Sequence, residues 1–289
     1  MEAFYVFDLS INGNLKWYGM KASCRQKNRK SSYWQNMLKT TSGILITLTF
    51  LMVTAKAVFS AEFSVYISQP RTLKLIVIEG EIMKGDYERF IKKIKQHNGK
   101  IGKVYIFSPG GNFFEAIKIG RAIRRLELTT VIPESEYGHP QCNPLANFPE
   151  HYNCTCEGSC FFIFIGGVNR VGTYIEVYSP SFDKNELGRL SEEDARNKFI
   201  ALQKSAREYM QEMVVPGYLQ DNILCTQPER AIKLDYETVE KYFHGDIPYR
   251  HELLQAKCAK LKDKEKIRDC YVAVDNERRL AAYETFFGK

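Results

Sequence analysis

The stretch VYIFSPGGNFFEAIKIGRAIR, residues 104–124, joins the end of a strand, a turn and most of a helix. Its first residues continue from Lys103 as an apolar run of β-formers, which is typical of a buried strand. Ser108-Pro109-Gly110-Gly111 interrupts that run as a turn, and Asn112 is placed to cap the helix that follows. We therefore predict a strand over 103–107 and a helix over 113–126. The fold needs the two glycines whatever chemistry the turn performs.

The same alternation continues on both sides of this stretch. Apolar runs at 73–79 and 128–133 predict two further strands, and apolar residues at helical spacing predict a helix over 86–97 with Asp86 as its N-cap. This β-α-β-α-β order implies an α/β fold with a mainly parallel sheet. Further along we expect an apolar element at 156–167, a strand at 173–178, a helix from Ser191 that begins with a capping box to Asp194, and a helical tail at 250–287.

The charge of the chain is concentrated at its N-terminus. The 289 residues carry a formal charge of +7, but residues 1–61 hold eight Lys or Arg and two acids, so 33 basic and 32 acidic residues remain beyond them. A nucleic-acid surface needs clustered basic residues on the folded body. The nearly neutral body argues against nucleic acid as a partner.

Residues 37–61 have the order of a secretory signal. A basic start at Lys39 precedes an apolar run, and small residues follow it. We expect cleavage after Ala57 or after Ala61, and a periplasmic or secreted protein. The alternative is an uncleaved membrane anchor, although the apolar run is short for a helix that spans a bilayer. Residues 1–36 lie upstream of a normal signal and are interpreted as an upstream extension outside the native chain or as a disordered segment.

The cysteine pattern agrees with export. Four of the eight cysteines fall within 142–160, where His139 and His151 also lie, but the spacing lacks the paired C-x2-C knuckles of a zinc site. Disulfides are therefore preferred over metal, and no cofactor is expected. The predicted pairs are Cys142–Cys154, which would pin an inserted loop at 134–155, then Cys156–Cys160 and Cys258–Cys270. This count leaves Cys225 free.

Four stretches of the sequence carry a family resemblance: IVIEGEIMKGDYERF, VYIFSPGGNFFEAIKIGRAIR, CEGSCFFIFIGGVNR and KLDYETVEKYF. Their order resembles the Clp protease/crotonase superfamily, and most of all its exported bacterial Clp-protease-like proteins of largely unassigned function. The resemblance covers about residues 73–245. It implies stacked β-β-α units, here in a body at 62–249 followed by a helical region at 250–289. It also implies that Gly110 and Gly111 donate N–H groups to an oxyanion, and that homo-oligomers form.

The resemblance also implies a catalytic triad, from which this chain departs. The position that matches the family's nucleophile is Gly158, and Ser159 comes one residue late. Tyr178 stands where the histidine base is expected, and Glu229 is the nearest carboxylate to the position of the aspartate. A serine hydroxyl is a weak nucleophile without a base. We therefore interpret Ser159 as a helix-start or packing serine, with a nucleophile that uses an unusual base as the alternative.

Three classes of function remain open from the sequence. The first is an exported protein with a degenerate triad that binds a peptide or protein partner in the former active-site cleft. The second is a serine hydrolase of peptidase type that uses Ser159 with a displaced base. The third is a metal-binding loop that uses the clustered cysteines with His139 and His151, which would otherwise be solvated loop residues. The sequence therefore leaves open whether the protein is an enzyme.

Overall fold

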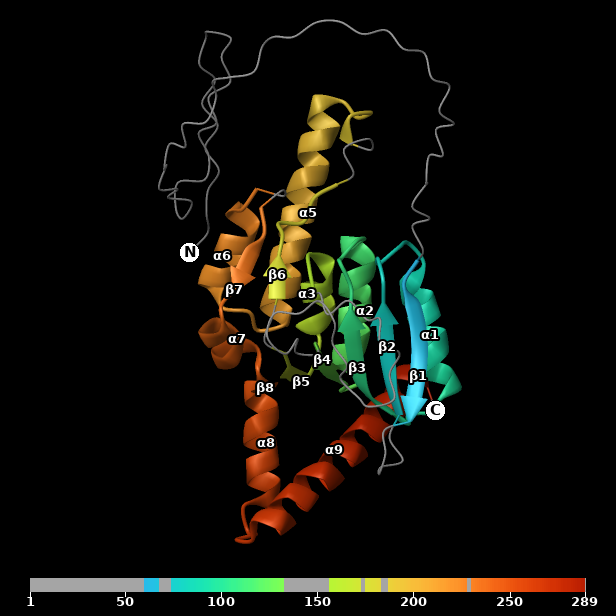
Figure 1. Cartoon of the computed structure of the whole chain (residues 1–289), viewed down its shortest axis with the longest axis vertical. Helices are drawn as coiled ribbons and strands as arrows, with labels where there is room; N and C mark the ends of the chain where they lie inside the picture. Colours follow the sequence, from blue (N-terminus) through green and yellow to red (C-terminus); the bar gives the residue numbers. More distant parts are fainter. Residues whose placement is uncertain are drawn as a thin grey trace, which may run out of the picture. The chain divides into compact units, whose positions relative to one another are not determined.

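A six-stranded sheet in the order β1-β2-β3-β4-β5-β8 forms the centre of the molecule (Figure 1). The computed structural model describes residues 60–67, 74–132, 156–172, 175–182, 187–227 and 230–288, all within one compact unit, Phe59–Lys289. The sheet strands are β1 Glu62–Ile67, β2 Lys74–Glu79, β3 Ile101–Phe107, β4 Thr129–Val131, β5 Asn169–Val171 and β8 Gly245–Asp246; a separate pair joins β6 Ile175–Val177 to β7 Ile232–Leu234.

The central strands of this sheet are parallel. β2, β3, β4 and β5 pair in parallel, while β1 and β8 run antiparallel at the two edges. Parallel strands are usually covered on both faces and therefore read as continuous apolar runs. Leu75, Ile76, Val77 and Ile78 are all buried in β2, in agreement with this rule. The predicted α/β class and mainly parallel sheet are confirmed.

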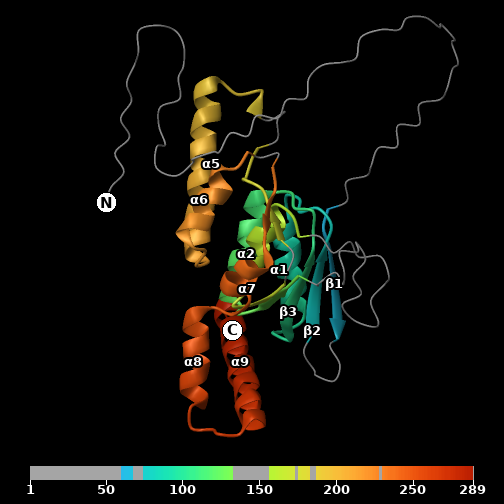
Figure 2. The same cartoon turned by 60° about the vertical axis from the view of Figure 1, so that its left-hand side comes forward.

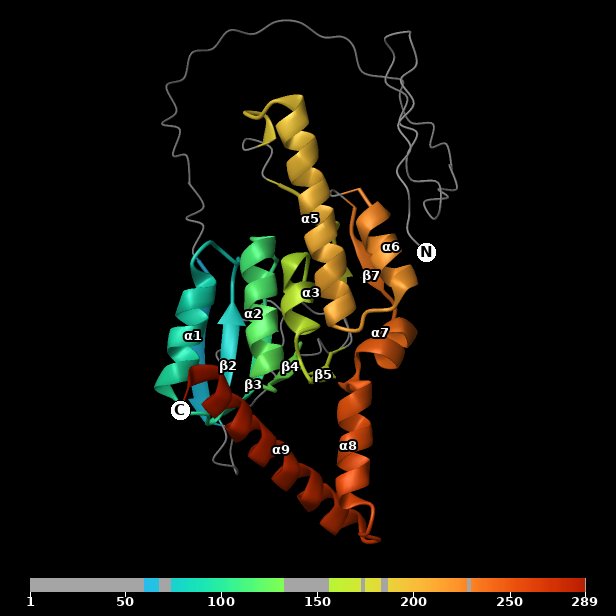
Figure 3. The same ribbon diagram turned by 180° about the vertical axis from the view of Figure 1, so that it is seen from behind.

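Helices α1, α2 and α3 lie side by side on one face of the sheet (Figure 3). Helix α1 presents an apolar stripe to it: Phe90 and Ile94 are buried while the lysines between them are not. Helix α3 is buried along its whole length. The described helices are α1 Asp86–Gln96, α2 Phe113–Arg125, α3 Ser159–Phe164, α5 Glu192–Glu212, α6 Gly217–Cys225, α7 Tyr236–Phe243, α8 Pro248–Cys258 and α9 Lys264–Phe287.

Between each strand and the next helix, the chain makes a short bridge to a neighbouring segment. These isolated parallel bridges are Ser60 to Glu81, Ile82 to Gly111, Ser108 to Cys156 and Glu157 to Glu176. The order strand, bridge, helix is repeated three times, through β2 and α1, β3 and α2, and β4 and α3. The predicted stacking of β-β-α units takes this form. We call the four bridges the bridge ladder.

Helix starts follow the sequence signals with one exception. Asn112 accepts a hydrogen bond from Glu115 N at 3.0 Å, and Ser191 accepts one from Asp194 N at 3.1 Å, so both predicted caps are confirmed. The prediction of Asp86 as a cap is wrong. Gly85, at φ +94°, holds the cap position, and Asp86 is the first helical residue. Its buried carboxylate instead accepts from Met83 N and Ser60 Oγ, because the turn before the helix folds back over it.

Helices α8 and α9 form a hairpin that leaves the body and returns to it (Figures 1 and 3). Cys258 and Cys270 are joined by a disulfide with 6.1 Å between their Cα atoms, as predicted. Helix α5 extends past the other end of the sheet (Figure 2), and its C-terminal half packs on α3 through Tyr209, whose hydroxyl donates to Phe162 O at 2.5 Å.

Candidate functional site

The turn that ends β3 is crowded by the two segments beside it in the bridge ladder. Gly110 and Gly111 have φ of +103° and +119°, a region that favours glycine. A Cβ on Gly110 would lie 2.8 Å from Glu157 O, and one on Gly111 would lie 2.3 Å from Ile82 O. Both positions therefore require glycine for its backbone conformation and for its lack of a side chain.

The N–H groups of these two glycines are used differently. Gly110 N donates to the Ser108 hydroxyl at 3.1 Å, and that hydroxyl donates to Gly80 O at 2.7 Å. The Ser108 hydroxyl thus occupies the N–H group of Gly110, one of the two predicted oxyanion donors. Gly111 N has no acceptor among the described residues, and Gly111 lines a cavity. Of the predicted pair, Gly111 is the one that lines the cavity and whose N–H has no partner among the described residues.

Gly158 forms a sharp turn between the ladder and α3. Its φ and ψ are +53° and −116°, and its N–H donates to Glu176 O at 2.9 Å. The disulfide between Cys156 and Cys160 closes this turn, with 5.2 Å between the Cα atoms, as predicted. The bridge and the disulfide together fix the direction in which a side chain at residue 158 would point.

A side chain at residue 158 would point into the centre of the site. An ideal Cβ built there lies 3.5 Å from Tyr178 Cδ2, 3.9 Å from Pro109 O and 4.0 Å from Gly110 Cα, all ordinary contact distances. The ladder therefore brings together the glycine turn, Gly158 and Tyr178, three of the elements that the sequence singled out. Gly158 contributes no functional group to this centre.

Ser159 lies beside this centre, but its hydroxyl already has a partner. Ser159 Oγ donates to Gly111 O at 2.7 Å, and the residue is 9% exposed. A hydroxyl that donates to a carbonyl is held by a neutral acceptor, which does not withdraw the proton as a general base does. The observed contact is that of a serine that packs the start of α3 against the turn.

Tyr178 lines the same cavity as Gly111 of the glycine turn. Burial raises the pKa of its phenol above the usual 10, and the nearby carboxylates of Glu157 and Glu176 raise it further. At neutral pH the phenol is protonated, so it serves as a hydrogen-bond donor and not as a general base. Glu157 and Glu176 themselves were not predicted as part of this region; their placement comes from the bridge between them.

The cavity at this centre has a volume of about 210 Å³. Besides the residues discussed above, sequence reasoning missed Phe113 and Phe162, whose rings meet edge to face with centroids 4.9 Å apart, and Ser179. Their apolar character is visible in the sequence, but it is equally typical of core positions. The lining is Gly111, Phe113, Gly158, Ser159, Phe162, Tyr178, Ser179, Pro180 and Ser181.

No described histidine lines this cavity. His97 lies beside Lys74 Nζ at 3.1 Å, where burial and then the charge of Lys74 lower its pKa, and His244 pairs with Glu240 on α7. Glu229, His139 and His151 lie outside the described residues. The described part of the chain therefore offers Ser159 no imidazole base.

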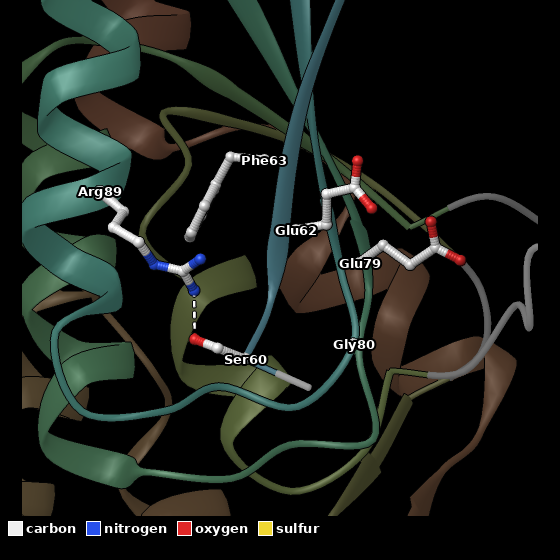
Figure 4. Close-up of a pocket in the computed structure, with 6 residues that line it drawn as sticks. All are labelled: Ser60, Glu62, Phe63, Glu79, Gly80 and Arg89. Atoms are coloured by element: carbon white, nitrogen blue, oxygen red, sulfur yellow. Dashed lines mark hydrogen bonds between the residues drawn. The ribbon is translucent and has the colours of Figure 1, made fainter. Parts of the chain in front are cut away.

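A second, more open cavity of about 510 Å³ lies at the β1 edge (Figure 4). Figure 4 shows Arg89 reaching Ser60 on one side of β1, while Glu62 and Glu79 lie on the other side. The two carboxylates face each other across the β1–β2 register, and burial followed by the charge of Glu62 raises the pKa of Glu79. The polar groups do not converge on a common point, so this cavity is not the candidate site.

The disulfides correct one prediction and weaken one alternative. Cys225 is disulfide-bonded, so the prediction that it is free is wrong; its partner lies outside the described residues, as do Cys142 and Cys154. Disulfide sulfurs are not thiolate ligands. Cys156 and Cys160 are thereby removed from any metal set, and the described residues contain no group of three or more candidate ligands.

The chain matches no family model and no curated protein. It is similar to a variant of ClpP1 from Listeria monocytogenes, with 13% identity, 58% of this chain and 86% of that chain covered, and a TM-score of 0.39. It is also similar to a variant of the 1510-N membrane-bound stomatin-specific protease, with 18% identity, 63% and 82% coverage, and a TM-score of 0.36. Within the described ranges, no helix is long and apolar enough to cross a membrane.

Proposed function

We propose that this chain is an exported, Clp-protease-like protein that binds a peptide or protein partner in the cleft of a lost active site and does not hydrolyse it efficiently. The observation that carries the proposal is Gly158. Its missing side chain would point between the Gly110 turn and Tyr178, at the place where the resemblance puts the nucleophile. The proposal extends to homo-oligomers, by analogy with the superfamily.

The backbone at Gly158 supports this assignment. Nucleophiles of strand-to-helix turns occupy strained conformations that expose the side chain. Gly158 has a positive φ and sits between a bridge of the ladder and α3. Glycine adopts this conformation without strain. The turn thus keeps the geometry of a nucleophile position and lacks the reacting atom.

The remaining groups suit binding. Gly111 N, with no acceptor among the described residues, and the protonated Tyr178 phenol are donors at the edge of a cavity lined by Phe113 and Phe162. A peptide carbonyl or carboxylate can accept from such donors while a small apolar side chain fills the cavity. Loss of a triad member leaves only the residual catalysis that oxyanion donors and binding supply.

One alternative has a specific observation in its favour. Ser159 lines the cavity and is the residue that a serine hydrolase with a displaced base would use. That reading requires its hydroxyl to leave Gly111 O and to meet a base from outside the described residues. The contact at 2.7 Å favours the packing role.

Active-site labelling separates the two readings. We expect no labelling of the purified, oxidised protein by a fluorophosphonate. Stoichiometric labelling that a Ser159→Ala change abolishes would show that the protein is a hydrolase. As a positive control, Gly158→Ser combined with Tyr178→His puts a hydroxyl and an imidazole where the cleft has room for them. Labelling at residue 158 in this variant would support the assigned nucleophile position.

Binding is tested with a random peptide library displayed against the oxidised protein. We expect selected peptides to lose affinity when Tyr178→Trp narrows the cavity. The matched change Tyr249→Trp alters a half-exposed tyrosine on α8 that does not line the cavity. Equal affinity in both variants would show that the peptides bind elsewhere.

A further inference from the structure

The α8–α9 hairpin is fastened to the body through side chains near its base, three of them arginines. Arg250 bonds Asp246 of β8 at 2.7 Å, and Arg278 Nε bonds Glu127 at 2.8 Å. Arg250 also pairs with Asp275 of α9, which links the two helices of the hairpin to each other. Arg279 donates to Gly99 O and to Ile101 O, further along α9. All of these contacts lie towards the sheet end of the two helices. The tip depends on a different set of contacts.

The tip has a small core of its own. Leu254, Cys258 and Val274 are buried there, with Leu261 and Tyr271 packed against them, and the Cys258–Cys270 disulfide crosses between the helices. This cluster is separate from the main core. A cluster this small buries little apolar surface, so a disulfide is a reasonable means to fix its shape. The tip is thus held rigid away from the body (Figure 3).

The tip also concentrates positive charge. Residues 257–268 hold six basic and two acidic residues, whereas the rest of the chain beyond residue 61 has 27 basic and 30 acidic residues. Among the described acids, only Asp269 lies within ion-pair distance of one of the six, at 3.6 Å from Arg268. All six side chains are exposed: Lys257, Lys260, Lys262, Lys264, Lys266 and Arg268.

The arrangement of these cations indicates the kind of partner. They lie on both sides of the turn at a projecting end, so they do not converge on one small anion. Leu261 and Ile267 are half-buried among them and offer apolar contact. A convex basic end with interspersed apolar side chains fits an extended anionic surface that also accepts apolar groups, and a lipid bilayer has both properties.

We propose that this tip, residues 257–268, docks the protein on an anionic lipid bilayer. The mildly acidic remainder of the body would be repelled by the same surface, so docking orients the molecule with its hairpin towards the lipid. This inference is independent of the proposed function, because neither the cavity nor Gly158 takes part in it.

Sedimentation with lipid vesicles tests the proposal. The protein purified from the cell envelope, after processing, is expected to bind vesicles of phosphatidylcholine with phosphatidylglycerol and not vesicles of phosphatidylcholine alone. The binding should weaken as salt rises. Each lysine near an anionic surface strengthens binding about fivefold, so Lys260→Gln, Lys262→Gln and Lys266→Gln together should weaken it by roughly 100-fold.

A matched triple variant controls for net charge. This variant removes the same charge from exposed lysines of the body: Lys84→Gln, Lys92→Gln and Lys103→Gln. We expect its affinity for the vesicles to stay within a few-fold of that of the native protein. Equal losses in both triple variants would overturn the proposal in favour of a general charge effect. Binding to soluble polyglutamate but not to the vesicles would overturn it in favour of an acidic protein partner.

Discussion

At the scale of single residues, the cleft depends on three glycines for two different reasons. Gly110 is needed because a Cβ there would lie 2.8 Å from Glu157 O, and Gly111 because a Cβ there would lie only 2.3 Å from Ile82 O. Gly158 is needed for its backbone conformation alone, since a Cβ there meets only ordinary contacts. The first two positions are therefore structural. The third can accept a side chain at the expense of local strain, and for this reason Gly158 is the informative position for function.

The crowding at Gly111 leads to a stability prediction. We expect Gly111→Ala to lower the free energy of unfolding by at least about 2 kcal/mol, from backbone strain and from overpacking against Ile82. The control is Gly85→Ala, at φ +94° with nothing within 4 Å of the added Cβ, which should show the strain alone. Urea unfolding measures both variants. If Gly111→Ala lowers the free energy of unfolding by less than Gly85→Ala does, the crowding around Gly111 is contradicted.

At the scale of elements, α1 and α2 are linked through one buried carboxylate. Glu115, in the first turn of α2, accepts from Gly85 N at 3.1 Å and Tyr87 N at 2.9 Å, and so satisfies donors at the start of α1. It also pairs with Lys118 at 2.9 Å. Burial alone would raise the pKa of Glu115, but these hydrogen bonds and the lysine lower it overall. The ionised form is thus favoured in the folded state.

This linkage predicts a dependence of stability on pH. Because the folded-state pKa is lowered, the carboxylate stabilises the fold above its unfolded pKa of about 4.3, and this contribution is lost as the pH falls through the folded pKa. Glu115→Gln should therefore destabilise the protein by about 1–3 kcal/mol at neutral pH, and the difference from the native protein should shrink below about pH 4. The control is Glu88→Gln, at an exposed position of α1. Thermal unfolding at a series of pH values compares the stability of both variants with that of the native protein.

At the scale of the whole molecule, periodicity predicted the parts of the fold that depend on local patterns. These parts are properties of short segments and could be predicted from the sequence directly: the apolar runs of β2 and β3, the stripe of α1 and the caps at Asn112 and Ser191. The candidate cleft depends on the bridge ladder, which joins segments up to 48 residues apart, from Ser108 to Cys156, through single bridges. No local pattern encodes such bridges, so the partner of Ser159 and the bond at Cys225 could not be predicted.

The start of the body makes a prediction about processing. Ala61 is fully buried, its carbonyl accepts from Arg89 Nη2 at 2.7 Å, and Ser60 Oγ donates to Asp86 at 2.7 Å. Cleavage after Ala61 would remove both residues from the fold. If the chain is exported, as proposed, we therefore expect the processed protein to begin at Val58, after the Ala57 site. N-terminal sequencing of the envelope protein measures this, and a start at Glu62 would contradict it.

The bridge ladder also has a consequence for the order of folding and for ligand linkage. Gly110, Gly158 and Tyr178 belong to three successive units. Under the proposal that the chain is exported, a chain that emerges with its N-terminus first has no cleft until the last of these residues has left the channel. A ligand of the cleft then binds the completed body and not its partly folded precursors. It stabilises the native state by mass action, by about 2.7 kcal/mol at a concentration of 100 times its Kd. A partner that binds the cleft outside the exporter would in this way shift the equilibrium of the last folding step towards the native state.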